Sequence, residues 1–105
     1  MLTLARPKMG RQRIPYGTRL PVYFTEQEVA DIREHTFADP EFGSFAVLEG
    51  SRLRFNLSLD DIEELQGNVA AEANHTENTQ LQRRLDRIFE KLQTFLDKYD
   101  DQAGE

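Results

Sequence analysis

The sequence lacks cysteine, and its 105 residues include only two histidines. Disulfide bonds, thiolate metal sites and cysteine nucleophiles are therefore excluded together. No apolar run approaches the roughly 18 residues that a membrane-spanning helix requires. The basic N-terminus also lacks the contiguous apolar segment of a secretory signal, so we expect a cytoplasmic protein. A chain of this length suffices for one domain with a single modest core.

Recognisable catalytic motifs are missing as well. The sequence has no nucleophile beside a base, no glycine-rich phosphate loop and no paired carboxylates of the acid–base type. Four acids do cluster, at positions 60, 61, 63 and 64. They stand at the start of a predicted helix, where the helix dipole favours negative charge. We therefore expect a protein that is not an enzyme and uses no cofactor.

Charge is distributed unevenly along the chain. The first 19 residues carry +5 and contain no acid, their basic residues being Arg6, Lys8, Arg11, Arg13 and Arg19. Residues 20–105 contain the other 8 basic residues and all 19 acidic residues, so they carry −11. Because glycine and proline interrupt residues 1–18, we predict a flexible basic arm there and a single domain over 19–105. The arm could bind nucleic acid or an acidic protein, or dock on its own body.

The strongest pattern lies in the last third of the chain. Apolar residues recur there at spacings of 4, 3, 4, 3 and 4, and two neighbours widen the band, which comprises Leu81, Leu85, Ile88, Phe89, Leu92, Phe95, Leu96 and Tyr99. This periodicity predicts a helix over 79–99 with a broad apolar side, flanked by Arg84, Lys91 and Lys98. The band fits an internal core and a dimer interface equally. So many apolar side chains in so small a domain favour an interface with another molecule. That molecule is either a second copy of the chain, which would form a homodimer, or a different protein.

Shorter patterns predict the elements before that helix. A strand near 20–24 leads into a helix that begins with a capping box of Thr25 and Glu28, buries Val29, Ile32 and Phe37, and ends at Asp39-Pro40. Two β-prone runs, 45–49 and 52–57, are joined by Gly50-Ser51 and predict a hairpin. In the second run Leu53, Phe55 and Leu57 alternate with Arg52, Arg54 and Asn56. We therefore predict that one face of this strand is buried and the other is exposed to solvent.

Two further capping boxes are predicted, Ser58 with Asp61 and Thr79 with Gln82. The first opens a helix over 59–75, whose apolar side comprises Ile62, Leu65, Val69 and Ala73. The second opens the final helix, and the short link between the two favours antiparallel packing. The fold class is therefore α+β, with a small antiparallel sheet covered by a C-terminal antiparallel helical hairpin.

The exposed face of the second β-run is a candidate for nucleic-acid binding. A strand followed by two helices resembles ribbon-helix-helix DNA-binding proteins, whose strands read bases in the major groove. Arg52, Arg54 and Asn56 would then contact bases, with Arg6, Lys8, Arg11 and Arg13 of the arm as further contacts. Against this, the following helices are acidic and the strand already has a hairpin partner, so a solvated face is the simpler interpretation.

Glu72 and His75 are the best candidates for metal ligands. Their spacing places a carboxylate and an imidazole on one helix face, as in di-iron bundles, which use two such pairs and two more glutamates. Only one pair occurs here, so other ligands such as His35 and Glu64 would be needed. A solvated Glu72 and a His75 favoured by the helix C-terminus explain the same residues, and we predict no metal site.

Three segments after Leu57 resemble an uncharacterised bacterial family. They are Ser-Leu-Asp-Asp-Ile-Glu-Glu-Leu, Val-Ala-Ala-Glu-Ala-Asn-His-Thr and Leu-Gln-Arg-Arg-Leu-Asp-Arg-Ile-Phe. Some members of that family are associated with plasmid or mobile-element reading frames. The resemblance implies a bacterial origin and carries no activity to any residue. We therefore expect a small protein-protein interaction module that self-associates through its C-terminal helices; the alternative is a nucleic-acid-binding accessory protein.

Overall fold

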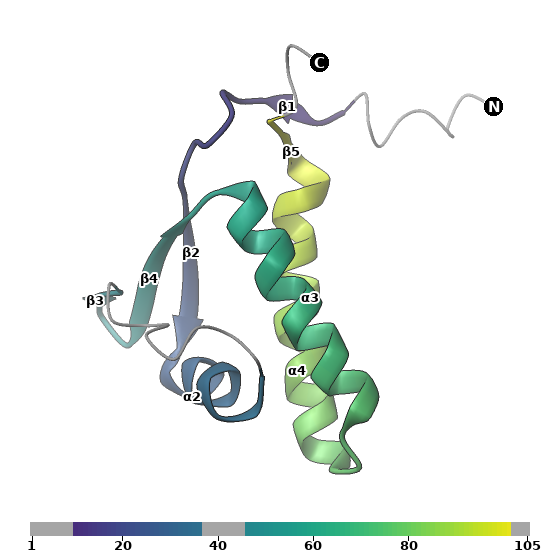
Figure 1. Cartoon of the computed structure of the whole chain (residues 1–105). Coiled ribbons are helices and arrows are strands. Elements are labelled where there is room, and N and C mark those ends of the chain that lie inside the picture. The colour runs from purple at the N-terminus through teal and green to yellow at the C-terminus, as the bar shows by residue number, and fades with distance from the viewer. Residues whose placement is uncertain (1–9, 37–45, 102–105) are drawn as a thin grey trace, which may run out of the picture.

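The protein has an α+β fold with a small antiparallel sheet, as predicted (Figure 1). The computed structural model describes residues 10–36 and 46–101. None of the helices in these two ranges is long and apolar enough to cross a membrane. The elements in chain order are β1 (Gln12–Arg13), β2 (Leu20–Thr25), α2 (Glu26–His35), β3 (Val47–Glu49), β4 (Arg52–Leu57), α3 (Leu59–His75), α4 (Thr79–Lys98) and β5 (Tyr99–Asp100).

The three-stranded sheet has the order β2-β4-β3, so β4 is central and β3 is an edge. Both pairings are antiparallel. The predicted hairpin is present: Gly50 has φ +65° and Ser51 does not have a positive φ, which fits a type II′ turn. Alternation places Phe55 of β4 on the core face, where its ring meets the ring of Phe24 edge-on at 5.4 Å between centroids.

The helix starts follow from side-chain caps. Thr25 and Ser58 form the two predicted capping boxes, with Glu28 and Asp61. The third predicted box is wrong, because Asn78 is the cap of α4 and its Oδ1 accepts a 3.0 Å hydrogen bond from the Leu81 amide. Asparagine is a better N-cap than threonine, and the helix therefore starts at Thr79, one residue earlier than it would if Thr79 were the cap.

The helix ends differ from the sequence prediction in two places. Helix α2 ends at His35, and the Thr36 hydroxyl closes it by donating to the Ile32 carbonyl at 2.7 Å. The predicted stop at Asp39-Pro40 and the predicted burial of Phe37 lie outside the described residues. Helix α4 ends at Lys98, one residue early, because Tyr99 enters the short strand β5.

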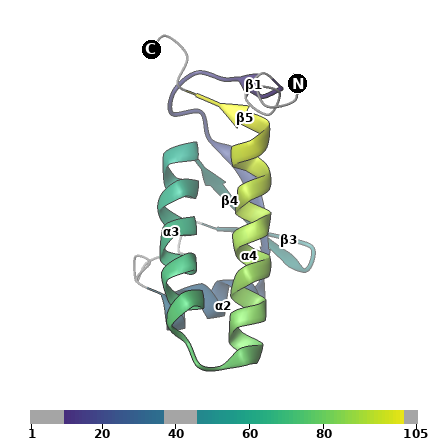
Figure 2. The ribbon, with the colours of Figure 1, turned by 90° about the vertical axis from the view of Figure 1, so that its right-hand side faces the viewer.

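The hydrophobic core lies between the sheet and the helices, and α4 is central to it. Figure 2 shows α3 and α4 side by side, with the sheet behind them. One connected cluster contains buried residues of every longer element: Leu20, Val22 and Phe24 of β2; Val29 and Ile32 of α2; Phe55 of β4; Leu59, Ile62, Leu65, Val69 and Ala73 of α3; Leu81, Leu85, Ile88 and Leu92 of α4. Gln66 links α3 to α4 by donating to Gln93 at 2.8 Å.

Part of the predicted flexible arm is ordered. Strand β1 pairs in parallel with β5, and the Ile14 amide donates to the Asp100 carbonyl at 3.0 Å. Ile14 itself is buried in the core cluster. Within residues 10–18, strand β1 and Ile14 are therefore in contact with the body, so regular structure begins before the predicted residue 19. The rest of the predicted arm, residues 1–9, lies outside the described residues.

Shortening the Ile88 side chain should destabilise the protein strongly. Ile88 is fully buried at the centre of α4. We expect Ile88→Ala to lower the free energy of unfolding by about 2–5 kcal/mol and Ile88→Val by about 0.5–1.5 kcal/mol, because each leaves a cavity of matching size. Urea unfolding followed by circular dichroism measures both. The exposed neighbour Arg87 supplies the control, since Arg87→Ala should change the free energy by less than about 0.5 kcal/mol; equal losses at 87 and 88 would contradict this core assignment.

Candidate functional site

The apolar side of α4 is mainly the core of its own chain. Leu81, Leu85, Ile88 and Leu92 are buried, with at most 4% of their surface exposed. The other four residues predicted for an interaction surface, Phe89, Phe95, Leu96 and Tyr99, are half-buried and pack against the same core. The eight residues therefore do not form an open interface, because the sheet, α2 and α3 already cover the middle of the band.

Two of the flanking charges bind within the chain. Lys91 donates to the Tyr23 carbonyl at 2.9 Å and to the Glu28 carboxylate at 2.7 Å. Arg84 makes a two-pronged contact with Asp31, at 2.8 Å from Nε and 3.2 Å from Nη2. This hydrogen bonding raises the pKa of Arg84. These charges therefore fasten α4 to α2 and β2, instead of flanking an interface with another molecule.

Asp31 was not singled out from the sequence, although it is 2% exposed. Removing Arg84 should leave the Asp31 carboxylate buried without its cationic partner. This lowers the free energy of unfolding more than replacing both partners by apolar residues. We therefore expect Arg84→Met to lower the urea midpoint, and the double variant Asp31→Leu with Arg84→Met to recover part of that loss. Arg83→Met, at an exposed neighbouring position, is the matched control. A double variant less stable than Arg84→Met would contradict this expectation, because it would show that the Asp31 carboxylate is favourable even without Arg84.

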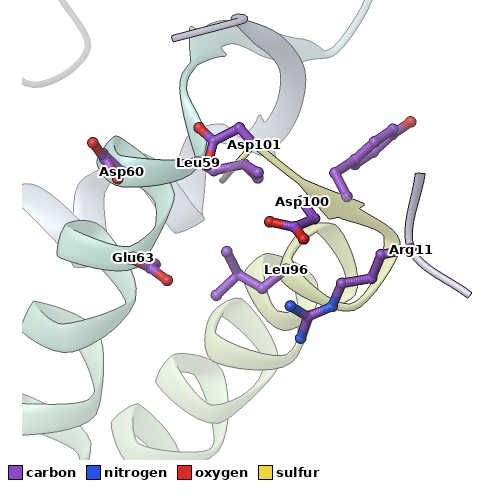
Figure 3. Close-up of a pocket in the computed structure, with 8 residues that line it drawn as sticks. Arg11, Leu59, Asp60, Glu63, Leu96, Asp100 and Asp101 are labelled. Carbon is purple, nitrogen blue, oxygen red and sulfur yellow. The ribbon is translucent and has the colours of Figure 1, made fainter. Parts of the chain in front are cut away.

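A small pocket lies where the N-terminal segment meets the ends of α3 and α4 (Figure 3). Its volume is about 100 Å³, and it is lined by Arg11, Leu59, Asp60, Glu63, Leu96, Tyr99, Asp100 and Asp101. One cation from the N-terminal segment thus stands among four carboxylates. Close by, Arg19 lies 3.6 Å from Asp61 and donates to the Asn56 carbonyl at 3.1 Å. The described part of the arm therefore contacts the acidic body, one of the three binding modes considered from the sequence.

Tyr16 adds a hydrogen bond to the same contact. Its hydroxyl donates to the Asp60 carboxylate at 2.5 Å. This hydrogen bond, and then the negative charge of Asp60, raise the pKa of Tyr16 above its ordinary value of 10.0. Because the folded-state pKa is the higher one, the contact stabilises the folded chain fully below pH 10.0 and loses its effect as the pH rises through the raised value.

Replacing Asp60 should return the pKa of Tyr16 toward its ordinary value. We expect Asp60→Asn to shift one phenol in an ultraviolet absorbance titration to lower pH, because the negative acceptor is gone. Tyr16→Phe identifies that phenol by removing it. Glu63→Gln changes a carboxylate on the same helix that does not contact Tyr16 by a hydrogen bond, and should shift it less. Titration curves that coincide for the unaltered protein and Asp60→Asn would contradict this contact.

The candidate nucleic-acid residues that the structure describes do not gather on one surface. Arg54 forms an ion pair with Glu49, while Arg52 and Asn56 are exposed. Arg13 is exposed on β1, which lies away from the β3–β4 hairpin (Figure 1). Arg11 lines the acidic pocket, and Arg6 and Lys8 lie outside the described residues. Within the described ranges, this leaves a broken basic surface next to carboxylates.

The weak metal candidate is equally isolated. Glu72 is half-buried and His75 is exposed at the end of α3. In residues 10–36 and 46–101, no three side chains of histidine, aspartate or glutamate are grouped so that they could hold a metal ion. Glu72 and His75 thus stand there without a third ligand.

An exposed apolar pair on β3, Val47 and Leu48, is a feature that the sequence analysis did not identify as a site. Among the described residues the exposed large apolar side chains are Tyr16 at 68%, Val47 at 42% and Leu48 at 64%. Val47 and Leu48 are adjacent on the edge strand β3, where they project to opposite faces of the sheet. The signal was present in the run 45–49, which is apolar on both faces and has no alternation with polar residues.

No family model, curated protein or solved structure matches this chain.

Proposed function

We propose that this chain is a noncatalytic bacterial protein-protein interaction module that self-associates. In this function α3 and α4 act as one antiparallel helical hairpin that covers the sheet and holds it rigid. The β3 surface, defined as Val47 and Leu48 with the outer edge of their strand, makes the contact. The chain thus binds a protein partner through its sheet edge and keeps its helical layer as a support.

One observation carries this function: the exposure of two neighbouring apolar residues on an edge strand. Edge strands offer backbone groups for pairing, and proteins that stay monomeric usually place charge or proline there. Here the strand is Val-Leu-Glu, and Leu48 is 64% exposed. Among the other described residues, eight large apolar side chains are fully enclosed, namely Val22, Phe24, Ile32, Ile62, Val69, Leu85, Ile88 and Leu92. An apolar edge beside so complete a core is typical of an interaction surface.

The nucleic-acid alternative has less support from the geometry. Binding to phosphates requires several uncompensated cations on one surface. Arg54 is paired with Glu49, Arg19 lies near Asp61 and Arg11 lines a pocket with four acids. Two basic residues near the N-terminus, Arg11 and Arg19, thus lie beside carboxylates of the body, while Arg13 is exposed.

Self-association should appear as a mass that rises with concentration. The β3 surface is small, so we expect a weak dimer with a dissociation constant on the order of 10–100 µM. Size-exclusion chromatography with light scattering, run across that range, measures the mass. A chain that keeps the monomer mass of 12.2 kDa throughout would overturn self-association.

The alternative is tested separately with mixed-sequence duplex and single-stranded oligonucleotides. We expect no binding that falls steeply with added salt, because Arg11, Arg19 and Arg54 lie beside carboxylates and the exposed Arg13 and Arg52 lie on separate elements. The test requires the full chain, since Arg6 and Lys8 must be present. Salt-dependent binding that Arg6→Gln and Lys8→Gln together abolish would favour the nucleic-acid function instead.

A further inference from the structure

We infer that the partner at the β3 surface is a second copy of this chain, which pairs its own β3 with this one in antiparallel register. Leu48 of each copy would face Leu48 of the other across a two-fold axis. The inference rests on the proposed self-association and specifies its surface and geometry. It joins two three-stranded sheets into one sheet of six strands.

The backbone of β3 sets this register. Glu49 and Arg52 flank the two-residue turn, so they form a hydrogen-bonded pair, and the pair Val47 and Arg54 follows two residues on. Successive residues of a strand direct their N–H and C=O groups to alternate sides. The N–H and C=O of Leu48 therefore point to the outer edge. Two such edges are self-complementary when Leu48 lies opposite Leu48, because each residue then gives and receives one hydrogen bond.

The side chains favour the same arrangement. On the core face, Phe24, Leu53 and Leu48 lie side by side across the three strands. Phe24 is fully buried, Leu53 is half-buried and Leu48 is 64% exposed, so the cover over this row decreases toward β3. Figure 2 shows the reason, since β3 extends beyond α4. A second copy would continue the row with its own Leu48 and Leu53 and cover the exposed leucine.

The charges near the edge permit the approach. In this register Glu49 would lie opposite Val47 of the second copy, so no two like charges face each other directly. Glu49 is also held by two groups of its own sheet, the Arg54 guanidinium and the Tyr23 hydroxyl, the latter at 3.2 Å. Its negative charge is therefore compensated before the copies meet. The two copies form a closed, isologous contact, the commonest kind in homodimers.

The first experiment compares variants of the full chain by light scattering over the concentration series. Leu48 is exposed in the single chain, so Leu48→Lys should leave folding intact while placing two like charges on the two-fold axis. We expect it to weaken dimerisation at least about tenfold. Asn74→Lys is the matched control, because it adds the same charge at an exposed position near the end of α3 and should leave the dissociation constant unchanged. Circular dichroism checks that both variants keep their helices.

The second experiment reads the backbone directly by amide hydrogen exchange, resolved by residue in NMR spectra. Strand pairing would place the Leu48 amide in an intermolecular hydrogen bond, so its exchange should slow as the protein concentration rises. The Val47 and Glu49 amides already face β4, and their exchange should change less. Contact through side chains alone would not produce this difference between neighbouring residues.

The outcomes separate this inference from the function on which it rests. A dimer that persists in Leu48→Lys, or a Leu48 amide whose exchange does not depend on concentration, would overturn strand pairing and leave self-association intact. A monomer at every concentration would overturn both, and would make a different protein the occupant of this edge. A dimer weakened by Leu48→Lys but not by Asn74→Lys, with a slowed Leu48 amide, would establish the pairing.

Discussion

The packing of every longer element on one side of α4 is the constraint on which the structure depends. The buried residues of α4 contact a cluster that includes side chains from β2, β4, α2 and α3. Charges at the edges of the same side fix the orientation, since Arg84 holds Asp31 and Lys91 holds both Glu28 and the Tyr23 carbonyl. Lys91 also lies 5.1 Å above the Phe24 ring. The helix thus carries the core and the charged contacts that position it against α2 and β2.

Part of the uneven charge of the sequence is compensated within the residues that the structure describes, where Arg11 and Arg19 lie beside acids of the body. The acids at the start of α3 have three roles. Asp61 completes the capping box of Ser58, Asp60 accepts a hydrogen bond from Tyr16, and both lie near basic residues of the N-terminal segment. Ile14 adds an apolar anchor, because its side chain is buried in the core cluster and its amide donates to the Asp100 carbonyl. An acidic body and a basic segment therefore combine into one fold, and the strong formal asymmetry does not by itself create a surface for phosphates.

Interactions between neighbouring residues made much of the fold predictable from the sequence. The parts that depend on contacts between residues far apart in the chain could not be predicted. Thr25, Ser58 and the Gly50-Ser51 turn act on neighbouring residues, so their helices and hairpin follow from the sequence. The pairing of β1 with β5 joins residues almost ninety positions apart by two short strands that have no periodic signal. The band on α4 predicts burial but cannot name the partner that provides it. The exposure of Leu48 depends on how far the helices extend over the sheet, which no spacing in the sequence encodes.

The same packing that completes the core also explains why the candidate surface lies at β3. Helices α3 and α4 cover β2 and the adjoining part of β4, because their apolar sides face Val22, Phe24 and Phe55. This layer is centred on β2 and the adjoining part of β4, so the outermost strand β3 extends beyond α4 and is left partly uncovered (Figure 2). An exposed leucine at that position lowers the solubility of the monomer, and it is not stabilised by burial in the core. It becomes favourable once a second strand covers it, which links the small size of this domain to association at its edge.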